Sequence, residues 1–517
     1  MDKFLSRYGS LVTGVLTGFD RLVFHGILQR LIRTLGMYYF LKDSGVQLID
    51  FKDYAVKKTE CIKQAALDEA TRFNRPVQYL ASARQSKEEL ARKILERDSV
   101  DEGLICLFTT VEPCITFSYV RSKNHHERGL KPTTSKCLHL YKYFVHPVFG
   151  FMSARLQTWF PFNIQICMNG REWLARQLLS KGYDDFRRVR NCFPWIKDFG
   201  LAQQLMNEQL NTNWPTALTE IARMMNPMHE EIFRNSPTEY YWSAFQTEWA
   251  TDLAFESSSA LAEIFPPLVR FAMLHLKSPD VMRFLADKAP GNFTGQIVTS
   301  FKRRVEGVRV KHWLRGNSIK MYDKAGSVLR IETTIGQTED FKVFRPKTDG
   351  PAHELQWLPL RKGVADLHRR SQVSNRSNTL YLDALSTSED TTPCSKLFDA
   401  VARPVVDSNG RRVRALRLSD PDELKLLDAI SRGEFSISGF RNRDIRQRLY
   451  GKDTSPAQTR TLSAKTGRLL RILREHGLLI KIPKTTRYRL AAHGQVLTSA
   501  IFATRNADIH TILKTAA

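Results

Sequence analysis

The chain has 517 residues, of which 42% are hydrophobic and 10% aromatic, and these proportions indicate a globular protein with sizeable cores and exclude a disordered one. Lys and Arg number 78 against 53 Asp and Glu, which gives a net charge of +25. A surface that basic attracts polyanions, and nucleic acid is the commonest partner of that kind.

The cysteines and the first residues bear on the compartment. The seven cysteines form no C-x-x-C pair, and their odd number argues against a zinc ribbon and against a secreted disulfide scaffold. The start, MDKFLSRYGSLVTGVLTGFD, carries early charges and only a short apolar run broken by glycine, so it predicts neither a signal peptide nor a membrane span. We therefore expect a soluble protein of the reducing cytoplasm that has no membrane partner.

Residues 1–170 are expected to form an α+β domain. Helical periodicity over 55–72 and 86–97 is followed by the β-rich runs GLICLFTTV, ITFSYV, HLYKYFVHPVFGFM and FNIQICMNG. Adjacent strands with few long helices between them predict a mostly antiparallel sheet. Asp20, in TGFDRLVFHG, lies in a strand-like segment, as does the first carboxylate of RNase H-like nucleases and transposases. A single Asp on a strand is also common without any catalytic role.

The next region, 171–300, has helical periodicity. Ser236-Pro237-Thr238-Glu239 has the pattern of a capped helix start, so we predict a helix over 239–255. In that helix Glu248 and Asp252 share a narrow stripe with aromatic residues. Burying two carboxylates is costly without a metal or a basic partner, which makes them candidate ligands. The alternative is a partly exposed stripe whose acids reach solvent or a salt bridge.

The stretch NSIKMYDKAGSVLRIETTIG, residues 317–336, predicts two strands joined by the turn KAGS. Pairing the strands through that turn sets Asp323 opposite Val328 and places Asp323, Arg330 and Glu332 on one face. A basic helix over 361–385 would then complete a third part of the body, 301–390.

Two interpretations of this acidic hairpin face remain open. In the first interpretation the face is a surface salt-bridge ladder of Asp323, Arg330 and Glu332. In the second, this face meets Glu248 and Asp252, so that four carboxylates converge. Such a cluster would hold Mg²⁺ or Mn²⁺, which activates water or a hydroxyl for phosphodiester chemistry. Arg330 would then help to neutralise the scissile phosphate.

The C-terminal part follows a linker, predicted over 391–419 from its Ser/Thr/Pro-rich composition. Residues 420–517 predict three helices followed by the strands LLIKI and RYRL, with Gly467 as a point where the third helix could break. This order resembles the winged helix-turn-helix DNA-binding domain, which implies duplex DNA as the partner. The candidate DNA contacts are the basic residues of the third helix and the wing: Arg460, Arg468, Arg471, Arg474, Lys481, Lys484, Arg487 and Arg489.

A second, shorter resemblance concerns the hairpin. MYDKAGSVLRIE is similar to the YDK…LRxE run of some rolling-circle replication initiators of phages and plasmids, which implies nicking through a tyrosine with a metal held by acidic or His residues. The paired His-hydrophobic-His motif of many such proteins is absent, because HLYKYFVH spaces its histidines seven apart. Tyr322 is also predicted to point away from Asp323, and His125 and His126 lie in a polar loop.

The sequence thus predicts a multi-domain α+β protein that binds DNA and processes its strands, as a transposase, a replication initiator or a nuclease of a mobile or replicating element. No GxxxxGKS, GxGxxG or HExxH motif is present, which argues against an ATPase, a dinucleotide enzyme and a zinc protease. The alternatives are a non-enzymatic DNA- or RNA-binding regulator and an RNA-processing enzyme.

Overall fold

The computed structural model describes the chain from residue 1 to residue 501 apart from several short segments. The segments outside the description are 82–84, 122–127, 277, 286–296, 305–306, 348–354, 387–393, 419, 432–438, 452–454, 484, 492–493, 495–496 and 499–500. The chain divides into two compact units, one of residues 1–273, 284–287 and 295–386 and one of residues 274–283, 288–294 and 387–517.

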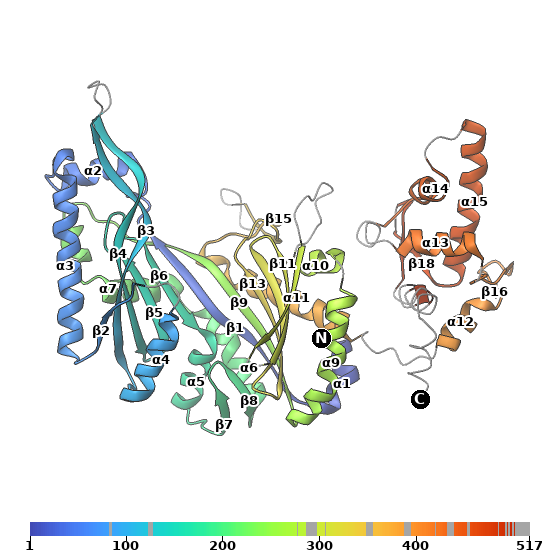
Figure 1. Ribbon diagram of the computed structural model, residues 1–517, viewed down its shortest axis with the longest axis horizontal. Helices are drawn as coiled ribbons and strands as arrows, with labels where there is room; N and C mark the ends of the chain where they lie inside the picture. The colour runs from blue at the N-terminus through green and yellow to red at the C-terminus, as the bar shows by residue number, and fades with distance from the viewer. Residues whose placement is uncertain are drawn as a thin grey trace. The chain divides into compact units, whose positions relative to one another are not determined.

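The first unit is built on one sheet of eleven strands, drawn in Figure 1. Its pairings are antiparallel apart from the one between β2 and β3, which confirms the α+β class with a mostly antiparallel sheet. Strands from all three ranges 1–170, 171–300 and 301–390 join it, so these parts share a single body. In spatial order the strands are β10 (Ile297–Arg304), β11 (Gly307–Leu314), β12 (Asn317–Lys324), β13 (Val328–Ile335), β9 (Tyr241–Phe255), β1 (Val12–Ile27), β6 (Ile164–Asn169), β5 (Gly150–Gln157), β4 (Arg128–His146), β3 (Gly103–Arg121) and β2 (Val77–Tyr79).

The predicted helix over 239–255 is wrong, because this segment is β9, which lies between β1 and β13 near the middle of the sheet. Five of its fifteen residues are aromatic and two are threonines, and both types favour strands. Long antiparallel partners on both sides satisfy its backbone, and this tertiary pairing overrides the capped-helix pattern at Ser236.

The predicted hairpin is present as β12 and β13, but its register differs by one residue from the prediction. Lys324 pairs with Val328, so Asp323 lies opposite Leu329 and Tyr322 lies opposite Arg330. The connection has three residues, and Ala325 and Gly326 both adopt positive φ angles, 56° and 80°. Because side chains alternate along a strand, this one-residue shift moves Asp323 to the other face from Arg330 and Glu332.

Helices cover the two faces of the sheet differently. α11 (Leu367–Leu385) packs on one face of β9 and β13, where the Asn378 amide donates hydrogen bonds to Trp249 O, Thr251 Oγ1 and Ile331 O. α5 (Gly170–Ser180) and α6 (Phe199–Glu208) pack against β1. α3 (Phe51–Arg72) runs beside the half of the sheet that contains β3, at the left in Figure 1.

The remaining elements of residues 1–386 are helices and short hairpins, and the helix Ser278–Leu285 among them is divided between the two units. They are α1 (Asp2–Tyr8), α2 (Thr34–Asp43), α4 (Lys87–Asp98), α7 (Trp214–Met225), α8 (His229–Ile232), α9 (Ser258–Leu274), α10 (Ser278–Leu285), β7 (Phe186–Val189), β8 (Cys192–Ile196), β14 (Lys342–Pro346) and β15 (Leu355–Pro359). A disulfide joins Cys114 of β3 to Cys137 of β4, a cross-link that the cysteine count did not predict. Among the described residues, no helix combines the length and the apolar character needed to cross a membrane.

The second unit contains three helices and a two-stranded hairpin in the predicted order. They are α13 (Pro421–Ser431), α14 (Asn442–Tyr450), α15 (Pro456–Glu475), β18 (Leu479–Lys481) and β19 (Tyr488–Leu490). α15 runs unbroken through Gly467. The predicted linker instead contains α12 (Cys394–Ala402) and a small hairpin of β16 (Val405–Val406) and β17 (Arg412–Val413). Val401 and Leu416 pack into the same core as Leu427 and Leu473, so this segment is part of the unit.

Candidate functional site

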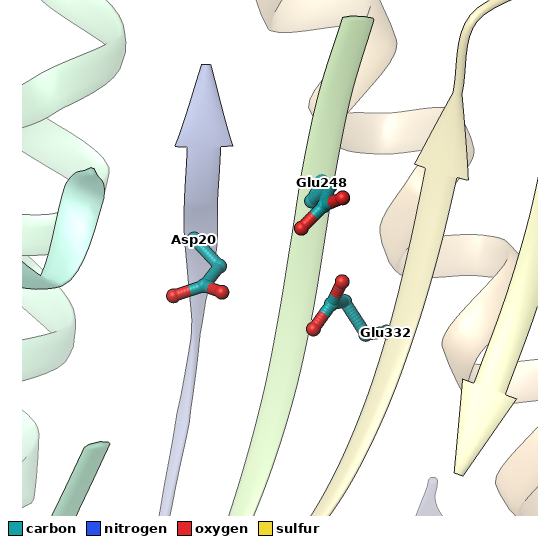
Figure 2. Close-up of side chains that lie close together, drawn as sticks. All are labelled: Asp20, Glu248 and Glu332. Carbon is teal, nitrogen blue, oxygen red and sulfur yellow. The ribbon is translucent and has the colours of Figure 1, made fainter. Parts of the chain in front are cut away.

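Three carboxylates converge on one face of the large sheet. Asp20 of β1, Glu248 of β9 and Glu332 of β13 each offer an oxygen, and these oxygens lie within 4.8 Å of one another. Figure 2 shows the three side chains on neighbouring strands, turned toward one another. Asp20 and Glu332 are buried and Glu248 is partly exposed, so the group opens toward solvent at Glu248. We call Asp20, Glu248 and Glu332 the acidic triad.

A β-bulge directs Asp20 into the triad. The pairing of β1 with β9 shifts between Phe19, opposite Trp249, and Arg21, opposite Glu248, so Asp20 is the extra residue. Bulges of this kind turn a side chain toward a site and are common beside active sites. Asp20 therefore reaches Glu248 from the neighbouring strand.

The start of α5 lies against this bulge. Asn169 Oδ1 caps the helix by accepting the backbone N–H groups of Arg171 at 2.8 Å and Glu172 at 3.2 Å, and Asn169 Nδ2 donates to Asp20 Oδ1 at 3.3 Å. A Cβ atom at Gly170 would lie only 1.9 Å from the backbone oxygen of Phe19. Glycine is therefore required for α5 to approach β1 this closely.

Asp20 is held as a carboxylate by polar and charged neighbours. Asn191 Nδ2, from the turn between β7 and β8, donates to both Asp20 oxygens at 2.7 and 2.8 Å. Arg330 Nη1 lies 3.3 Å from Asp20 Oδ2. Burial alone would raise the pKa of Asp20, but the Arg330 and Arg171 guanidinium groups and the Asn191 hydrogen bonds lower it below its usual value.

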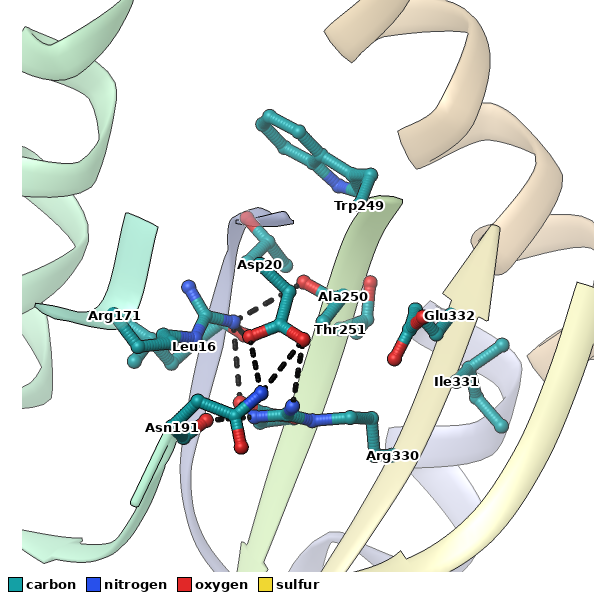
Figure 3. Close-up of polar contacts among 12 residues, drawn as sticks. Leu16, Asp20, Arg171, Asn191, Trp249, Ala250, Thr251, Arg330, Ile331 and Glu332 are labelled. Atoms are coloured by element: carbon teal, nitrogen blue, oxygen red, sulfur yellow. Dashed lines mark hydrogen bonds and ion pairs between the residues drawn. The ribbon is translucent and has the colours of Figure 1, made fainter. Parts of the chain in front are cut away.

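A buried ion-pair network lies beside Asp20 and is centred on Asp252. Arg330 donates to Asp252 through Nε at 2.5 Å and Nη2 at 2.8 Å, and Arg171 Nη2 donates to Asp252 Oδ2 at 3.1 Å. Arg330 Nη2 also donates to Asn191 O at 2.6 Å. Figure 3 shows Arg171, Asn191 and Arg330 converging from α5, the β7–β8 turn and β13. Arg330 and Arg171 are both 0% exposed, so their guanidinium groups face buried carboxylates and not solvent.

The open side of the triad carries Lys320 and Tyr322 of β12. The Lys320 ammonium contacts Glu332 and lies 3.9 Å from Glu248 Oε2, and Tyr322 OH donates to Glu332 Oε2 at 2.8 Å. Burial and the Glu332 charge raise the pKa of Glu248 to about 8, although Lys320 partly offsets them. Burial would lower the pKa of Lys320, but Glu332 and Glu248 raise it above its usual value. One ammonium therefore does not relieve the repulsion between the two glutamates.

The structure brings together only part of the predicted metal cluster. Glu248 and Glu332 belong to the triad, whereas Asp252 pairs with two arginines. Residues four apart on a strand are separated by about 13 Å, so Glu248 and Asp252 cannot bind the same ion. Asp323 lies on the opposite face, where burial raises the pKa of its carboxyl group.

Three residues of this site, Asp20, Lys320 and Tyr322, were not predicted to lie beside Glu248 and Glu332. Asp20 was an isolated candidate, and its relation to Glu248 depends on a bulge and on a distant strand. Lys320 and Tyr322 alternate along β12 and face Glu332 and Arg330 in the observed register. A correct count of the three-residue turn would have placed them beside Glu332 and removed Asp323.

In the second unit, the predicted DNA contacts fall into two groups. Arg460, Arg468, Lys481 and Arg489 are exposed and form no ion pair with another described residue, although Arg468 Nε donates to Ala464 O at 3.4 Å; Arg471 and Arg474 are exposed as well. The other described candidates have partners within the protein: Arg471 Nη2 pairs with Asp407 Oδ2 at 2.6 Å, Arg474 Nη2 pairs with Glu475 Oε1 at 2.6 Å, and Arg487 Nη2 donates to Gly439 O at 3.0 Å. Lys484, like His125 and His126 of the first unit, lies outside the described residues.

Comparison of the chain with protein-family models, with curated proteins and with solved structures gives no match.

Proposed function

We propose that this protein is a divalent-metal-dependent enzyme that cleaves or transfers phosphodiester bonds in DNA, with the acidic triad as its catalytic centre. The observation that carries the proposal is the convergence of three carboxylate oxygens within 4.8 Å on a face that opens to solvent. A transposase, a replication initiator and a nuclease all use chemistry of this class.

The donor set fits a hard divalent cation. Mg²⁺ and Mn²⁺ prefer carboxylate oxygens, and ligands at their usual bond lengths lie within about 4 to 5 Å of one another. The raised pKa of Glu248 reflects burial and the nearby Glu332 charge, a repulsion that a cation between them would remove. When bound, such an ion activates water or a hydroxyl and stabilises the leaving oxygen.

The chain's own residues would prepare the site. Arg330 keeps Asp20 ionised, and Asn191 fixes both Asp20 oxygens in place. Tyr322 orients Glu332 by donating to Oε2. Lys320, on the open side, is placed to form an ion pair with a phosphate oxygen of the substrate. These interactions supply preorganised charge, which is a large part of phosphoryl-transfer catalysis.

The proposal includes the second unit as a DNA-holding module. Three helices followed by a hairpin is the element order of the winged helix, and the exposed Arg460, Arg468, Lys481 and Arg489 would contact phosphates. This unit would bring duplex DNA to the enzyme.

The competing function is a DNA- or RNA-binding regulator without catalysis. One observation favours it: Lys320 already contacts Glu332 and approaches Glu248. If Lys320 is the permanent counter-ion of the triad, no metal is needed. The two functions therefore differ in what happens when Lys320 is removed.

The test combines metal binding with cleavage by the full chain. Mn²⁺ titration calorimetry should show binding that Glu248→Gln and Glu332→Gln abolish, and cleavage of single-stranded, duplex or hairpin DNA should fall by orders of magnitude in both variants. Asp323→Asn is the matched control and should keep both properties, because Asp323 lies on the other face. Cleavage that survives both Gln substitutions would reject the triad as the site.

Lys320→Met separates the enzyme from the regulator. If the triad binds metal, loss of the competing ammonium should tighten Mn²⁺ binding by about tenfold, since one nearby like charge is removed. If neither the natural chain nor Lys320→Met binds Mn²⁺, the regulator is the better description.

A further inference from the structure

The face of the sheet that carries the triad continues across β12, β11 and β10 as a cationic surface. Residues that pair directly across neighbouring strands point to the same face of a sheet. The pairs on this face are Lys302–Arg309, Arg309–Tyr322, Lys311–Lys320 and Trp313–Ser318. Four of these residues are basic, Lys324 of β12 lies on the same face, and none of the described residues on this face of the three strands is acidic. We call Lys302, Arg309, Lys311, Lys320 and Lys324 the cationic strip.

The opposite face of these strands is the buried one. His312, Val310 and Met321 point to that face and are each 0% exposed, and His312 Nε2 lies 3.1 Å from the Tyr381 hydroxyl of α11. Lys302 is exposed, and Lys311, Lys320 and Lys324 are partly exposed. The strip is therefore the accessible face of this end of the sheet.

The basic groups of the strip are close enough to repel one another. Burial lowers the pKa of Lys311, and the charges of Lys320 and Arg309 lower it further. Several cations gathered on one sheet face repel one another, and a bound polyanion would lower that repulsion. At the inner end of the strip, Lys320 contacts Glu332 and approaches Glu248 of the triad.

Aromatic rings alternate with the cations. Lys311 Nζ lies 4.4 Å from the centroid of the Trp313 ring, and Lys320 Nζ and Lys324 Nζ lie 5.7 and 6.0 Å from the centroid of the Tyr322 ring. Trp313 is partly exposed. A sheet face with cations for phosphates and an aromatic ring for bases suits single-stranded nucleic acid, because its bases are unstacked and available.

We propose that the cationic strip binds single-stranded DNA and leads it to the acidic triad. This inference deepens the proposed function, on which it depends for the role of the triad. The strip would bind three or four phosphates, and Lys320, shared by strip and triad, would mark the point where the strand enters the catalytic centre.

The test measures binding without chemistry. Fluorescence anisotropy of a labelled 20-nucleotide single strand in EDTA measures DNA binding to the strip even if the triad never binds metal. Failure of this binding can therefore be distinguished from failure of the proposed metal-dependent cleavage. All variants are made in a full chain that also carries Arg460→Ala and Arg468→Ala, which weakens the second unit. In this background the double variant Lys302→Gln/Lys311→Gln should weaken single-stranded DNA binding about tenfold at low salt. The slope of log K against log salt concentration should also be smaller than in the background protein.

The control removes two exposed lysines elsewhere in the first unit. Lys57→Gln/Lys93→Gln changes the net charge equally on α3 and α4 and should alter the Kd less than twofold. Trp313→Leu should weaken the binding of single-stranded DNA but not the binding of duplex DNA. Equal effects of the strip and control pairs would overturn the proposal. Tighter binding of duplex or of single-stranded RNA than of single-stranded DNA would overturn the assignment of the ligand.

Discussion

Glu248 and Asp252 lie four residues apart on the same face of β9, but their surroundings are opposite. Asp252 accepts hydrogen bonds from two buried guanidinium groups, so its charge is compensated. Glu248 lies 3.9 Å from the Lys320 ammonium, which Glu332 shares, and burial with the charges of Glu332 and Asp20 raises its pKa to about 8. Asp252 therefore stabilises the sheet, whereas Glu248 is held at an energetic cost that a function would explain.

Substituting these two residues should separate stability from function. Asp252→Asn leaves Arg330 and Arg171 buried with one anion fewer, and we expect a loss of about 3 kcal/mol or more of unfolding free energy. Glu248→Gln mimics the protonated carboxyl group, so stability without metal should be unchanged or higher. Thermal unfolding of both variants in EDTA measures this, and equal destabilisation by the two changes would contradict it.

His312 gives the first unit a predictable acid sensitivity. Its ring is buried between Thr299 Oγ1 at 2.9 Å and Tyr381 OH at 3.1 Å, and burial lowers its pKa to about 4. The unfolded chain takes up this proton below pH 6.5 and the folded chain only near pH 4, so stability falls as pH falls through that window. The cost at pH 5 is about 2 kcal/mol.

A variant without the ionisable ring isolates this effect. His312→Gln cannot be protonated, so the stability difference between it and the natural chain should shift by about 2 kcal/mol in favour of the variant between pH 7.5 and pH 5. Urea unfolding at the two pH values provides the measurement. A constant difference would show that His312 does not titrate in this window.

At the scale of elements, the site depends on strands whose identity the local sequence only partly reveals. The Glu248–Asp252 spacing of four suits one face of a helix and equally one face of a strand. That ambiguity explains why their common face was predicted while the helix was wrong. Only pairing with β1 and β13, which lie far away in the sequence, decides the conformation and places Asp20 and Glu332 beside Glu248.

The hairpin shows a different limit of sequence reasoning. Its two strands were predicted, because their apolar residues and the KAGS turn are local signals. The register was not, because a four-residue and a three-residue connection both fit that turn. Since one residue of register exchanges the two faces, the error moved Asp323 into the site and Tyr322 out of it.

Gly170 tests whether the packing of α5 against β1 positions the site. An added Cβ would meet the Phe19 backbone oxygen at 1.9 Å, so Gly170→Ala should push α5 away from Asp20 and disturb Asn169. We expect destabilisation by about 1–3 kcal/mol and weaker Mn²⁺ binding. Gly9→Ala is the control, because its nearest neighbour would be 4.0 Å away. Normal Mn²⁺ binding by Gly170→Ala would show that α5 does not position the triad.

At the scale of the whole molecule, the chain forms two compact units, each with charged groups of its own. The first unit concentrates buried carboxylates and the cationic strip on one sheet. The second unit has its own core, formed by residues between 398 and 501, which includes part of the predicted linker. The order of the three C-terminal helices was predicted from the sequence because each has local start and stop signals, whereas the packing of residues 394–416 on them is a tertiary contact that composition does not encode.

The second unit should bind duplex DNA without the first. Because α12 contributes Val401 to its core, the fragment to express is 394–517 rather than one that starts after the predicted linker. If Arg460, Arg468, Lys481 and Arg489 each contact a phosphate, log K should fall with log salt with a slope of about −3 to −4. Arg460→Ala/Arg468→Ala should weaken binding about tenfold, whereas Arg471→Ala should have a smaller effect, because Arg471 already pairs with Asp407 at 2.6 Å. A mobility-shift titration at several salt concentrations measures these effects. Binding that is insensitive to salt, or an Arg471→Ala loss as large as that of the double variant, would show that the unit contacts DNA through another face.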